Sequence, residues 1–224
     1  MPVSLKSPKI LPYGDSAILI DYETPGYSDR VHTRLSHLAQ TLRAQGTWQD
    51  IVPSYKSVLA VFDVAHLSMG EAMSKIEETL KSLSRSPCRT GKLIEIPVVY
   101  GGRYGPDMAT IKKASGLSQS DVIDIHSGED YRVCMMGFIP GFCFLSDVPS
   151  VLQHPRHDTP RAHVPAGSVG IAGWQTGIYG LGSPGGWQII GRTPLKLFDP
   201  AREKPFLMEA GDKVRFIPSS KALF

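Results

Sequence analysis

The chain has 224 residues, of which 42% are hydrophobic and 20% are charged, and its formal net charge is +3. This composition is typical of one large or two small globular domains and excludes extensive disorder. The weak and dispersed positive charge argues against a nucleic-acid surface, which needs a concentrated basic face. The N-terminus lacks a signal-peptide pattern and no apolar run reaches the roughly 20 residues of a membrane span, so we expect a cytoplasmic protein.

The first part of the chain alternates strand and helix patterns. Residues 10–13 and 16–22 are β-prone and are separated by Gly14-Asp15, which predicts a hairpin. A helix is expected from Ser28 onward, where apolar residues repeat at helical spacing. Those residues are Val31, Leu35, Leu38 and Leu42.

Two more strands and a helix complete this part. Residues 51–54 and 57–64 have the composition of strands. Ser68 followed by Glu71 is a capping-box pattern, and it predicts a helix with one apolar face. That face consists of Met73, Ile76, Leu80 and Leu83. The order strand, strand, helix, strand, strand, helix predicts a two-layer α+β unit.

A polar segment containing both Pro and Gly, residues 84–91, predicts a domain boundary. We therefore expect an α+β domain over residues 1–88 and a second domain over residues 89–224. The second domain opens with a β-branched strand at residues 93–100. Two short helices are expected next, at residues 106–115 and 118–126.

After Tyr131 the composition changes to short apolar runs between turns rich in Gly and Pro. The runs are residues 164–169, 188–190, 195–198 and 213–217. This spacing predicts a β-barrel or sandwich rather than a wound parallel sheet.

Glycine and proline are dense in three segments of this second domain, and arginines are interleaved with them. The segments are GFIPGFCFL (137–145), HPRHDTPRAHVPAGSVGIAG (154–173) and QTGIYGLGSPGGWQIIGRTPLKLFD (175–199). Gly and Pro are unfavourable inside strands, so this density predicts tight, pre-shaped loops at strand ends, where ligands are usually held.

Two Pro-Arg pairs carry candidate anion contacts. Arg156 and Arg161 each follow a proline, which stiffens the backbone before a guanidinium that can grip a carboxylate or phosphate by two hydrogen bonds. Arg192, between Gly191 and Thr193, is a third candidate. The alternative is that these arginines form surface salt bridges.

The histidines could supply a general acid or base, or they could simply be solvated or hydrogen-bonded side chains. Those of the second domain are His126, His154, His157 and His163. The sequence has no HxxxH or HExxH pattern, and its cysteines, Cys88, Cys134 and Cys143, form no CxxC pair, so we expect neither a metal site nor a disulfide framework. A GxxxxGK[ST] phosphate loop and a GxSxG elbow are absent too, so the chain lacks a standard cradle for ATP.

The three segments, together with IEIPVVYGGRYGPD (94–107), resemble the KipI family, also called the allophanate hydrolase subunit 1 family. That family includes the B subunit of the prokaryotic 5-oxoprolinase complex, which the chain resembles most. The resemblance implies a ferredoxin-like α+β domain followed by a cyclophilin-like β-barrel. It also implies a stable complex with a sister barrel protein, the C subunit, which is like allophanate hydrolase subunit 2. Cooperation with a larger A subunit, of the lactam-utilisation type, is implied as well.

The implied reaction is the ATP-dependent opening of 5-oxoproline to glutamate, with ATP and Mg as cosubstrate through the complex and no tightly bound cofactor in this chain. The candidate catalytic residues are His126, His154, Arg156 and Arg161. The candidate substrate- or nucleotide-binding residues are Pro140, Gly141, Phe142, Gln175, Tyr179, Ser183, Gly185, Gly186, Trp187, Arg192 and Thr193. We expect the chain to be inactive alone, where it could also form a homo-oligomer.

Other family members leave two alternatives open: a protein inhibitor of a sensor histidine kinase, and an amide-binding carboxyltransferase-like protein related to urea and allophanate enzymes. The chain departs from the family pattern at Gly180, where a proline is usual, and at Phe144, where tyrosine is more common. The first change predicts a looser loop after Tyr179, and the second removes a hydroxyl group.

Overall fold

The computed structural model describes residues 7–24, 28–83 and 91–220, which belong to two units, Met1–Thr90 and Gly91–Phe224. The predicted boundary between residues 88 and 89 lies outside the described residues. Each unit has its own hydrophobic core.

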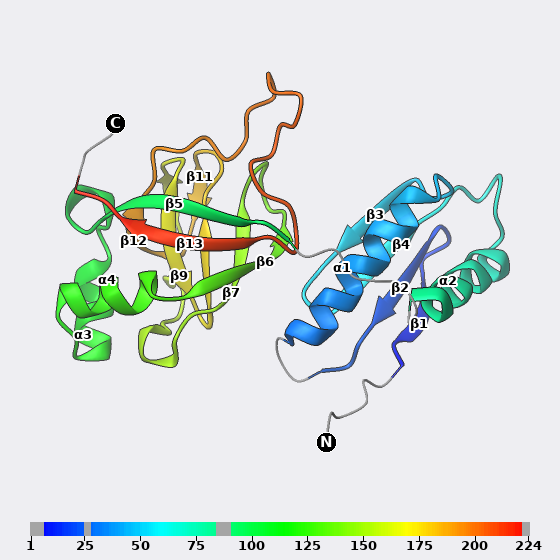
Figure 1. Cartoon of the computed structure of the whole chain (residues 1–224), viewed down its shortest axis with the longest axis horizontal. Helices are drawn as coiled ribbons and strands as arrows, with labels where there is room; N and C mark the ends of the chain where they lie inside the picture. Colours follow the sequence, from blue (N-terminus) through cyan, green and yellow to red (C-terminus); the bar gives the residue numbers. More distant parts are fainter. Residues whose placement is uncertain (1–6, 25–27, 84–90, 221–224) are drawn as a thin grey trace. The chain divides into compact units, whose positions relative to one another are not determined.

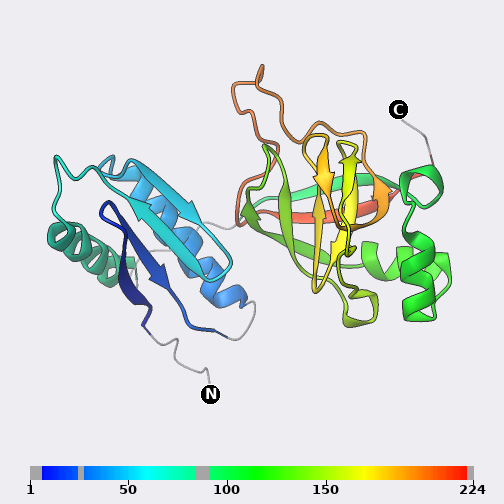
Figure 2. The same cartoon turned by 180° about the vertical axis from the view of Figure 1, so that it is seen from behind.

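The first unit is a four-stranded antiparallel sheet with two helices on one face. Its elements are β1 (Lys9–Tyr13), β2 (Ala17–Asp21), α1 (Asp29–Ala44), β3 (Asp50–Pro53), β4 (Ser57–Val61) and α2 (Met69–Leu83). The strand order is β1-β2-β4-β3. The two opposite views in Figures 1 and 2 show both helices on the same side of the sheet.

Local signals account for these elements. Ser28 caps α1 by accepting a hydrogen bond from the Val31 N–H, and the predicted apolar face of that helix is buried. At the start of α2 the Ser68 N–H donates to the Glu71 carboxylate, and the Glu71 N–H donates to the Ser68 hydroxyl, as the capping-box pattern predicts. Strand β4 ends at Val61, earlier than predicted, because Asp63 starts a turn by accepting from the Ala65 N–H.

The strand-strand-helix-strand-strand-helix order of the first unit is a cyclic shift of the ferredoxin-like strand-helix-strand-strand-helix-strand order. An α+β unit is therefore confirmed, and the ferredoxin-like arrangement stays a prediction.

The second unit contains a closed β-barrel, as predicted. Its helices and strands are β5 (Leu93–Tyr100), η1 (Gly102–Tyr104), α3 (Met108–Ser115), α4 (Gln119–Ser127), β6 (Asp130–Met136), β7 (Cys143–Asp147), η2 (Ser150–Leu152), β8 (Arg161–Val164), β9 (Ser168–Ala172), β10 (Gln175–Ile178), β11 (Ser183–Gly185), β12 (Gln188–Arg192) and β13 (Lys213–Pro218). The barrel order is β10-β7-β6-β13-β5-β12-β9, and β8 pairs with β11 in a separate two-stranded sheet. Strands β5 and β13 are parallel, while the other neighbours in the barrel are antiparallel.

Two strand predictions in this unit were wrong. The predicted strand at residues 164–169 is divided between β8 and β9, because Gly167 adopts a left-handed conformation (φ 81°) and turns the chain. The predicted strand at residues 195–198 is irregular, and only Phe198 forms an isolated bridge, to Phe206. Figure 1 shows this part of the chain (orange) projecting from the barrel between β12 and β13.

Candidate functional site

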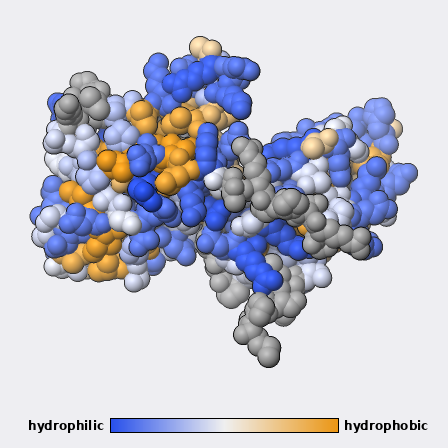
Figure 3. Space-filling model, viewed as in Figure 1, coloured by the Kyte–Doolittle hydropathy of each residue, from blue (hydrophilic) through white to orange (hydrophobic). Residues whose placement is uncertain are grey.

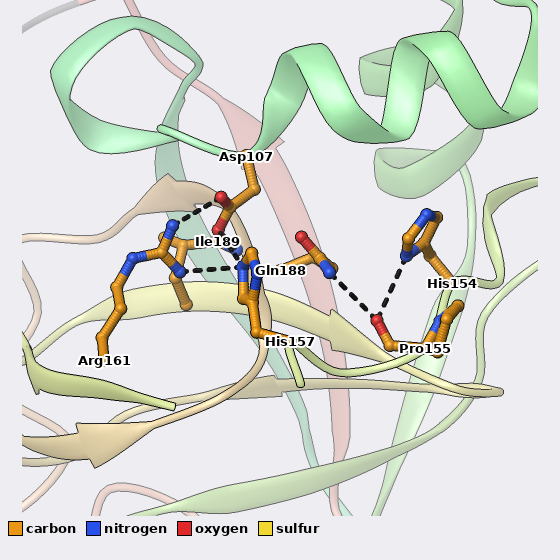
Figure 4. A network of polar contacts seen from close by, with 7 residues as sticks. All are labelled: Asp107, His154, Pro155, His157, Arg161, Gln188 and Ile189. Carbon is orange, nitrogen blue, oxygen red and sulfur yellow. Dashed lines mark hydrogen bonds and ion pairs between the residues drawn. The ribbon is translucent and has the colours of Figure 1, made fainter. Parts of the chain in front are cut away.

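Three side chains from separate segments meet on the outside of the barrel, beside the start of α3 (Figure 4). The Arg161 Nη2 donates to the Asp107 Oδ1 at 2.6 Å, and the Arg161 Nη1 lies 3.0 Å from the His157 Nε2. The same His157 nitrogen lies 3.3 Å from the Asp107 Oδ2. We call Asp107, His157 and Arg161 the polar triad.

Asp107 is the anchor of the polar triad. It precedes α3 and is tied to β12 twice, because its backbone N–H donates to the Ile189 carbonyl at 2.9 Å and its Oδ2 accepts from the Ile189 N–H at 2.6 Å. Its side chain is only 6% exposed. A buried carboxylate is stable only when charge and hydrogen bonds compensate it, and Arg161 with the Ile189 amide supplies both.

His157 is the member of the polar triad whose ring can both accept and donate a hydrogen bond. Its Nε2 accepts from Arg161 when that nitrogen is deprotonated, and it can donate to Asp107 when it carries a proton. The side chain is 28% exposed, so protons can reach it from solvent. Its backbone N–H donates to the Gly186 carbonyl at 2.7 Å, which holds the loop beside β11. The arrangement is therefore suited to general acid–base chemistry.

A cavity of about 230 Å³ adjoins the polar triad and shares Arg161 with it. Its lining consists of Arg103, Tyr104, Pro106, Arg161, His163, Val164, Pro165, Ser168, Ile189 and Arg192. Two of the predicted arginines, Arg161 and Arg192, are thus brought to one cavity. The Arg192 Nε donates to the Ala166 carbonyl at 2.8 Å, which orients its guanidinium.

An aromatic cluster packs beside β8 and β11, and it contains the predicted Phe142, Tyr179 and Trp187. The Phe142 ring lies edge-on to the other two, with centroid distances of 4.9 Å and 5.4 Å. Burial raises the pKa of Tyr179, while a hydrogen bond with the Trp187 backbone and the charges of Arg161 and Arg156 partly oppose the shift. The Tyr179 hydroxyl therefore stays protonated at neutral pH.

Of two predicted glycines in this region, Gly185 allows a close approach and Gly186 has ordinary van der Waals neighbours. A Cβ at Gly185 would lie 2.2 Å from the Tyr179 hydroxyl, so only glycine fits there. Gly186 faces the loop that carries Arg156, whose Cβ would lie 3.8 Å from a Cβ at this position. Gly185 is thus required by packing against Tyr179.

The predicted catalytic residues do not all meet. His126 is completely buried in the barrel core, where its Nδ1 lies 2.8 Å from the Tyr100 hydroxyl and its Nε2 lies 2.9 Å from the Thr176 hydroxyl. Burial lowers the pKa of His126 to about 3, so it is neutral at physiological pH. Its contacts place it outside the polar triad and the cavity lining.

His154 and Arg156 lie on the loop before β8. The Nδ1 of His154 lies 3.1 Å from the Pro155 carbonyl oxygen, which also accepts from the Gln188 Nε2 at 3.0 Å (Figure 4). The Gln188 Oε1 is buried and has no hydrogen-bond partner among the described residues. Arg156 is exposed, and unlike Arg161 it is not part of the polar triad.

The remaining predicted binding residues are spread over the barrel. Ser183 and Thr193 are buried, and Gln175 donates to the Leu145 carbonyl at 3.5 Å. Pro140 and Gly141 form the turn before β7. A Cβ at Gly180 would lie 2.4 Å from the Pro140 carbonyl oxygen, so the chain is closely packed at this position, and the looser loop stays a prediction.

Asp107 and Arg103 are site residues that local sequence patterns did not identify. The signal for Asp107 was present as Pro106-Asp107 before a predicted helix, but nothing local identifies its partner, Arg161, which lies 54 residues away.

Among the described residues no group of His, Cys, Asp and Glu could hold a metal ion, and no helix is long and apolar enough to cross a membrane. Cys134 and Cys143 are buried free thiols, while Cys88 lies outside the described residues.

Comparisons with known proteins agree with the barrel and its motifs. Residues 8–208 match the family described as carboxyltransferase domain, subdomain C and D. The B subunit of 5-oxoprolinase from Escherichia coli O157:H7 is 39% identical over 210 residues, covering 94% of this chain and 95% of that protein. The protein of the same name from Haemophilus influenzae is 40% identical over 210 residues, covering 93% of this chain and 96% of that protein.

Longer proteins match as well. The urea amidolyase of Saccharomyces cerevisiae is 25% identical over 252 residues, covering 96% of this chain and 14% of that protein. The crystal structure of TTHA0988 superposes with a TM-score of 0.81 at 36% identity, covering 92% of this chain. Our chain spans 40% of that solved chain.

Proposed function

The chain belongs to the carboxyltransferase domain family, subdomain C and D, and from this premise we propose that it is a subunit of a 5-oxoprolinase complex, which opens 5-oxo-L-proline to L-glutamate. Support comes from relatives named as the B subunit of 5-oxoprolinase, which match over nearly their whole length. The structural observation that carries the proposal is the polar triad, a partly exposed histidine between a buried carboxylate and a guanidinium.

Opening the lactam adds the oxygen of water to the ring carbonyl carbon and breaks the carbon–nitrogen bond, and the leaving nitrogen takes up a proton. An unstrained amide resists this attack, so the reaction needs activation of the carbonyl oxygen. In our proposal ATP with Mg would provide that activation through the complex by transferring its γ-phosphoryl group to the carbonyl oxygen, and a second water would release that group as phosphate, leaving ADP. This chain contains no GxxxxGK[ST] loop, so its own contribution is made by side chains beside the cavity.

His157 would transfer the proton, and Asp107 with Arg161 would keep its ring in position. Arg161 and Arg192 would face negative charge that develops on the substrate, since both line the cavity. His154 remains a candidate for a second proton-transferring residue, and Arg156 remains a candidate for binding an anion. The aromatic cluster around Phe142 would support the loops behind the site.

We also propose that the chain works with two partner proteins, a sister barrel protein (the C subunit) and a larger A subunit. The second unit exposes several large apolar side chains, and Figure 3 shows apolar patches (orange) on its surface. These side chains are Leu93, Phe138, Val151, Leu181, Leu195, Phe206 and Ile217. Exposed apolar patches commonly mark protein interfaces. The match covers only 40% of the TTHA0988 chain, so the rest of that polypeptide could correspond to such a partner.

The finer fold assignments belong to the same proposal. We infer a ferredoxin-like first unit whose edge strand, β1, comes from the start of the chain, and a cyclophilin-like barrel in the second unit. The KipI or allophanate hydrolase subunit 1 description and a cytoplasmic location go with this inference.

The match to urea amidolyase favours a second candidate, an amide-binding protein related to carboxyltransferases. The two candidates differ in substrate, because urea has no carboxylate whereas 5-oxoproline has one.

The test is reconstitution. The chain is co-expressed with the sister barrel protein (the C subunit) and the larger A subunit. Phosphate and glutamate are then measured with Mg-ATP and 5-oxoproline. We expect both products from the complex and neither from the chain alone. A complex that ignores 5-oxoproline and turns over ATP with urea would support the second candidate, and robust turnover by the isolated chain would contradict the proposed dependence on partners.

A further inference from the structure

The cavity beside the polar triad is lined by three arginines and one histidine from three elements. Arg103 comes from η1, Arg161 and His163 come from β8, and Arg192 comes from β12. No Asp or Glu is among the described residues that line it. Guanidinium groups stay charged at every pH at which proteins are folded, so the lining carries three permanent positive charges, of which the one on Arg161 is compensated by Asp107.

Close packing at two glycines positions two of these side chains, Arg192 and His163. Gly167, at φ 81°, brings the loop so close to β12 that a Cβ there would lie 2.1 Å from the Thr193 carbonyl oxygen. This approach lets the neighbouring Ala166 carbonyl accept from the Arg192 Nε. Just before β11, a Cβ at Gly182 would lie 2.8 Å from the His163 ring. Glycines at both positions therefore allow Arg192 and His163 to reach the cavity.

Arg161 is held by Asp107 while it lines the cavity. Because that carboxylate is buried, Arg161 is held in place before any ligand arrives, and less conformational entropy is lost on binding. Arg103 stacks over the Tyr104 ring with its guanidinium carbon 4.7 Å from the ring centroid, which restrains it in the same way.

The size of the cavity limits its ligand. Pockets for drug-sized molecules are roughly 300–1,000 Å³, so a cavity of about 230 Å³ admits a small acid or the end of a larger anion. A whole nucleotide does not fit inside it. The buried Ser168 and the backbone of the loop before it complete a polar wall beside the cations.

We propose that this cavity binds an anionic oxygen group, a carboxylate or a phosphoryl group, gripped by Arg103, Arg161 and Arg192. The inference rests on the proposed function for the source of the ligand, because 5-oxoproline carries a carboxylate and ATP carries phosphates. Charge-assisted hydrogen bonds to these guanidiniums supply the affinity.

The experiment measures binding by the full chain alone, by calorimetry and by the shift in Tm. The ligands are inorganic phosphate, ATP, 5-oxoproline and 2-pyrrolidinone, which has the same ring without a carboxylate. We expect at least one anion to bind, more weakly as ionic strength rises, and the neutral lactam not to bind. Binding of phosphate and ATP alone assigns the cavity to the phosphoryl group, and binding of 5-oxoproline alone assigns it to the carboxylate.

Variants locate the site. Arg103→Gln and Arg192→Gln should each weaken anion binding about tenfold or more. Arg103 is exposed, so its substitution leaves the fold intact even where Arg192→Gln loosens the loop. Arg215→Gln is the control, because Arg215 pairs with Asp130 on the surface and does not line the cavity. Failure of every anion to bind wild type, or equal binding by all three variants, overturns the inference. An inactive reconstituted complex would instead contradict the proposed function without affecting this result.

Discussion

Two histidines of the second unit, His126 and His157, each have two polar partners, and the two regions differ in charge and in access to water. His126 is fully buried between the Tyr100 and Thr176 hydroxyls and stacks on the Phe216 ring at 4.6 Å. His157 lies between a carboxylate and a guanidinium and is partly exposed.

The difference shows how one residue type acquires opposite roles. Without a countercharge, burial makes the imidazolium of His126 unfavourable and lowers its pKa to about 3. Its ring therefore serves as a neutral hydrogen-bonding element of the core. His157 lies 3.3 Å from the Asp107 carboxylate and is partly exposed to solvent, so its position suits proton transfer.

Of the changes that test the difference between His126 and His157, a substitution of His157 should have the largest effect, and the effect should be on turnover. In the reconstituted complex His157→Gln should lower kcat by about 10²–10⁴-fold, the usual contribution of a general acid or base, with an unchanged Tm. His66→Gln is a matched control, because His66 also pairs with an aspartate, Asp63, at 3.0 Å but on the surface of the first unit. Equal activity of the two variants would count against a role for His157.

Loss of a buried carboxylate, Asp107, should lower the free energy of unfolding more than loss of an exposed one, Asp130. Asp107→Asn removes the charge that compensates Arg161 and weakens the bond to the Ile189 amide, so the free energy of unfolding should fall by about 2–3 kcal/mol. Asp130→Asn breaks the exposed pair with Arg215 and should cost at most about 1 kcal/mol. Urea denaturation measures both. Similar losses in the two variants would mean that Asp107 is not the structural anchor we describe.

The neutral state of His126 has a consequence for acid stability. Its pKa is about 3 in the folded protein and 6.5 in the reference state, so between these values the unfolded chain binds a proton that the folded chain does not. Unfolding therefore becomes easier as pH falls through this window, by up to about 1.4 kcal/mol per pH unit. His126→Gln should be less stable at neutral pH yet show a flatter dependence on pH. An unchanged slope in denaturation at several pH values would contradict the neutral state of this histidine.

The smallest effect on the free energy of unfolding is expected for the arginine of the first Pro-Arg pair, Arg156. Arg156 is exposed, so Arg156→Ala should change the free energy of unfolding by less than about 0.5 kcal/mol. Arg161→Ala should destabilise the fold several times more, because it leaves the buried Asp107 without its cation. Thermal melts of the two variants side by side decide this. A large loss in Arg156→Ala would show that the loop before β8 depends on both arginines.

Local patterns predicted much of the fold. The capping box at Ser68, the helical apolar repeats and the β-branched strand at residues 93–100 each depend on near neighbours, and all were confirmed. The apolar run at residues 195–198 failed as a strand because hydrophobicity alone does not supply a pairing partner. The strand β7 was missed because the turn that contains Pro140 and Gly141 lies directly before it and indicated a loop.

The site was predictable only as a region. Glycine, proline and arginine density indicated the loops that surround the polar triad, and Arg161 was among the residues chosen. The pairing of Asp107 with Arg161 and Ile189 joins residues 54 and 82 positions apart, which no local pattern records. Burial is likewise a property of the packed barrel, so the sequence could not separate His126 from His157.

The central claim is that the polar triad works as one unit in catalysis, and a double-mutant cycle tests it most directly. Turnover of 5-oxoproline is measured for complexes carrying Asp107→Asn, His157→Gln or both. If Asp107 acts through His157, the double variant should be no slower than the slower single variant, because residues that act as a unit are not additive. Losses that multiply in the double variant would show that the two residues act independently and would contradict the claim.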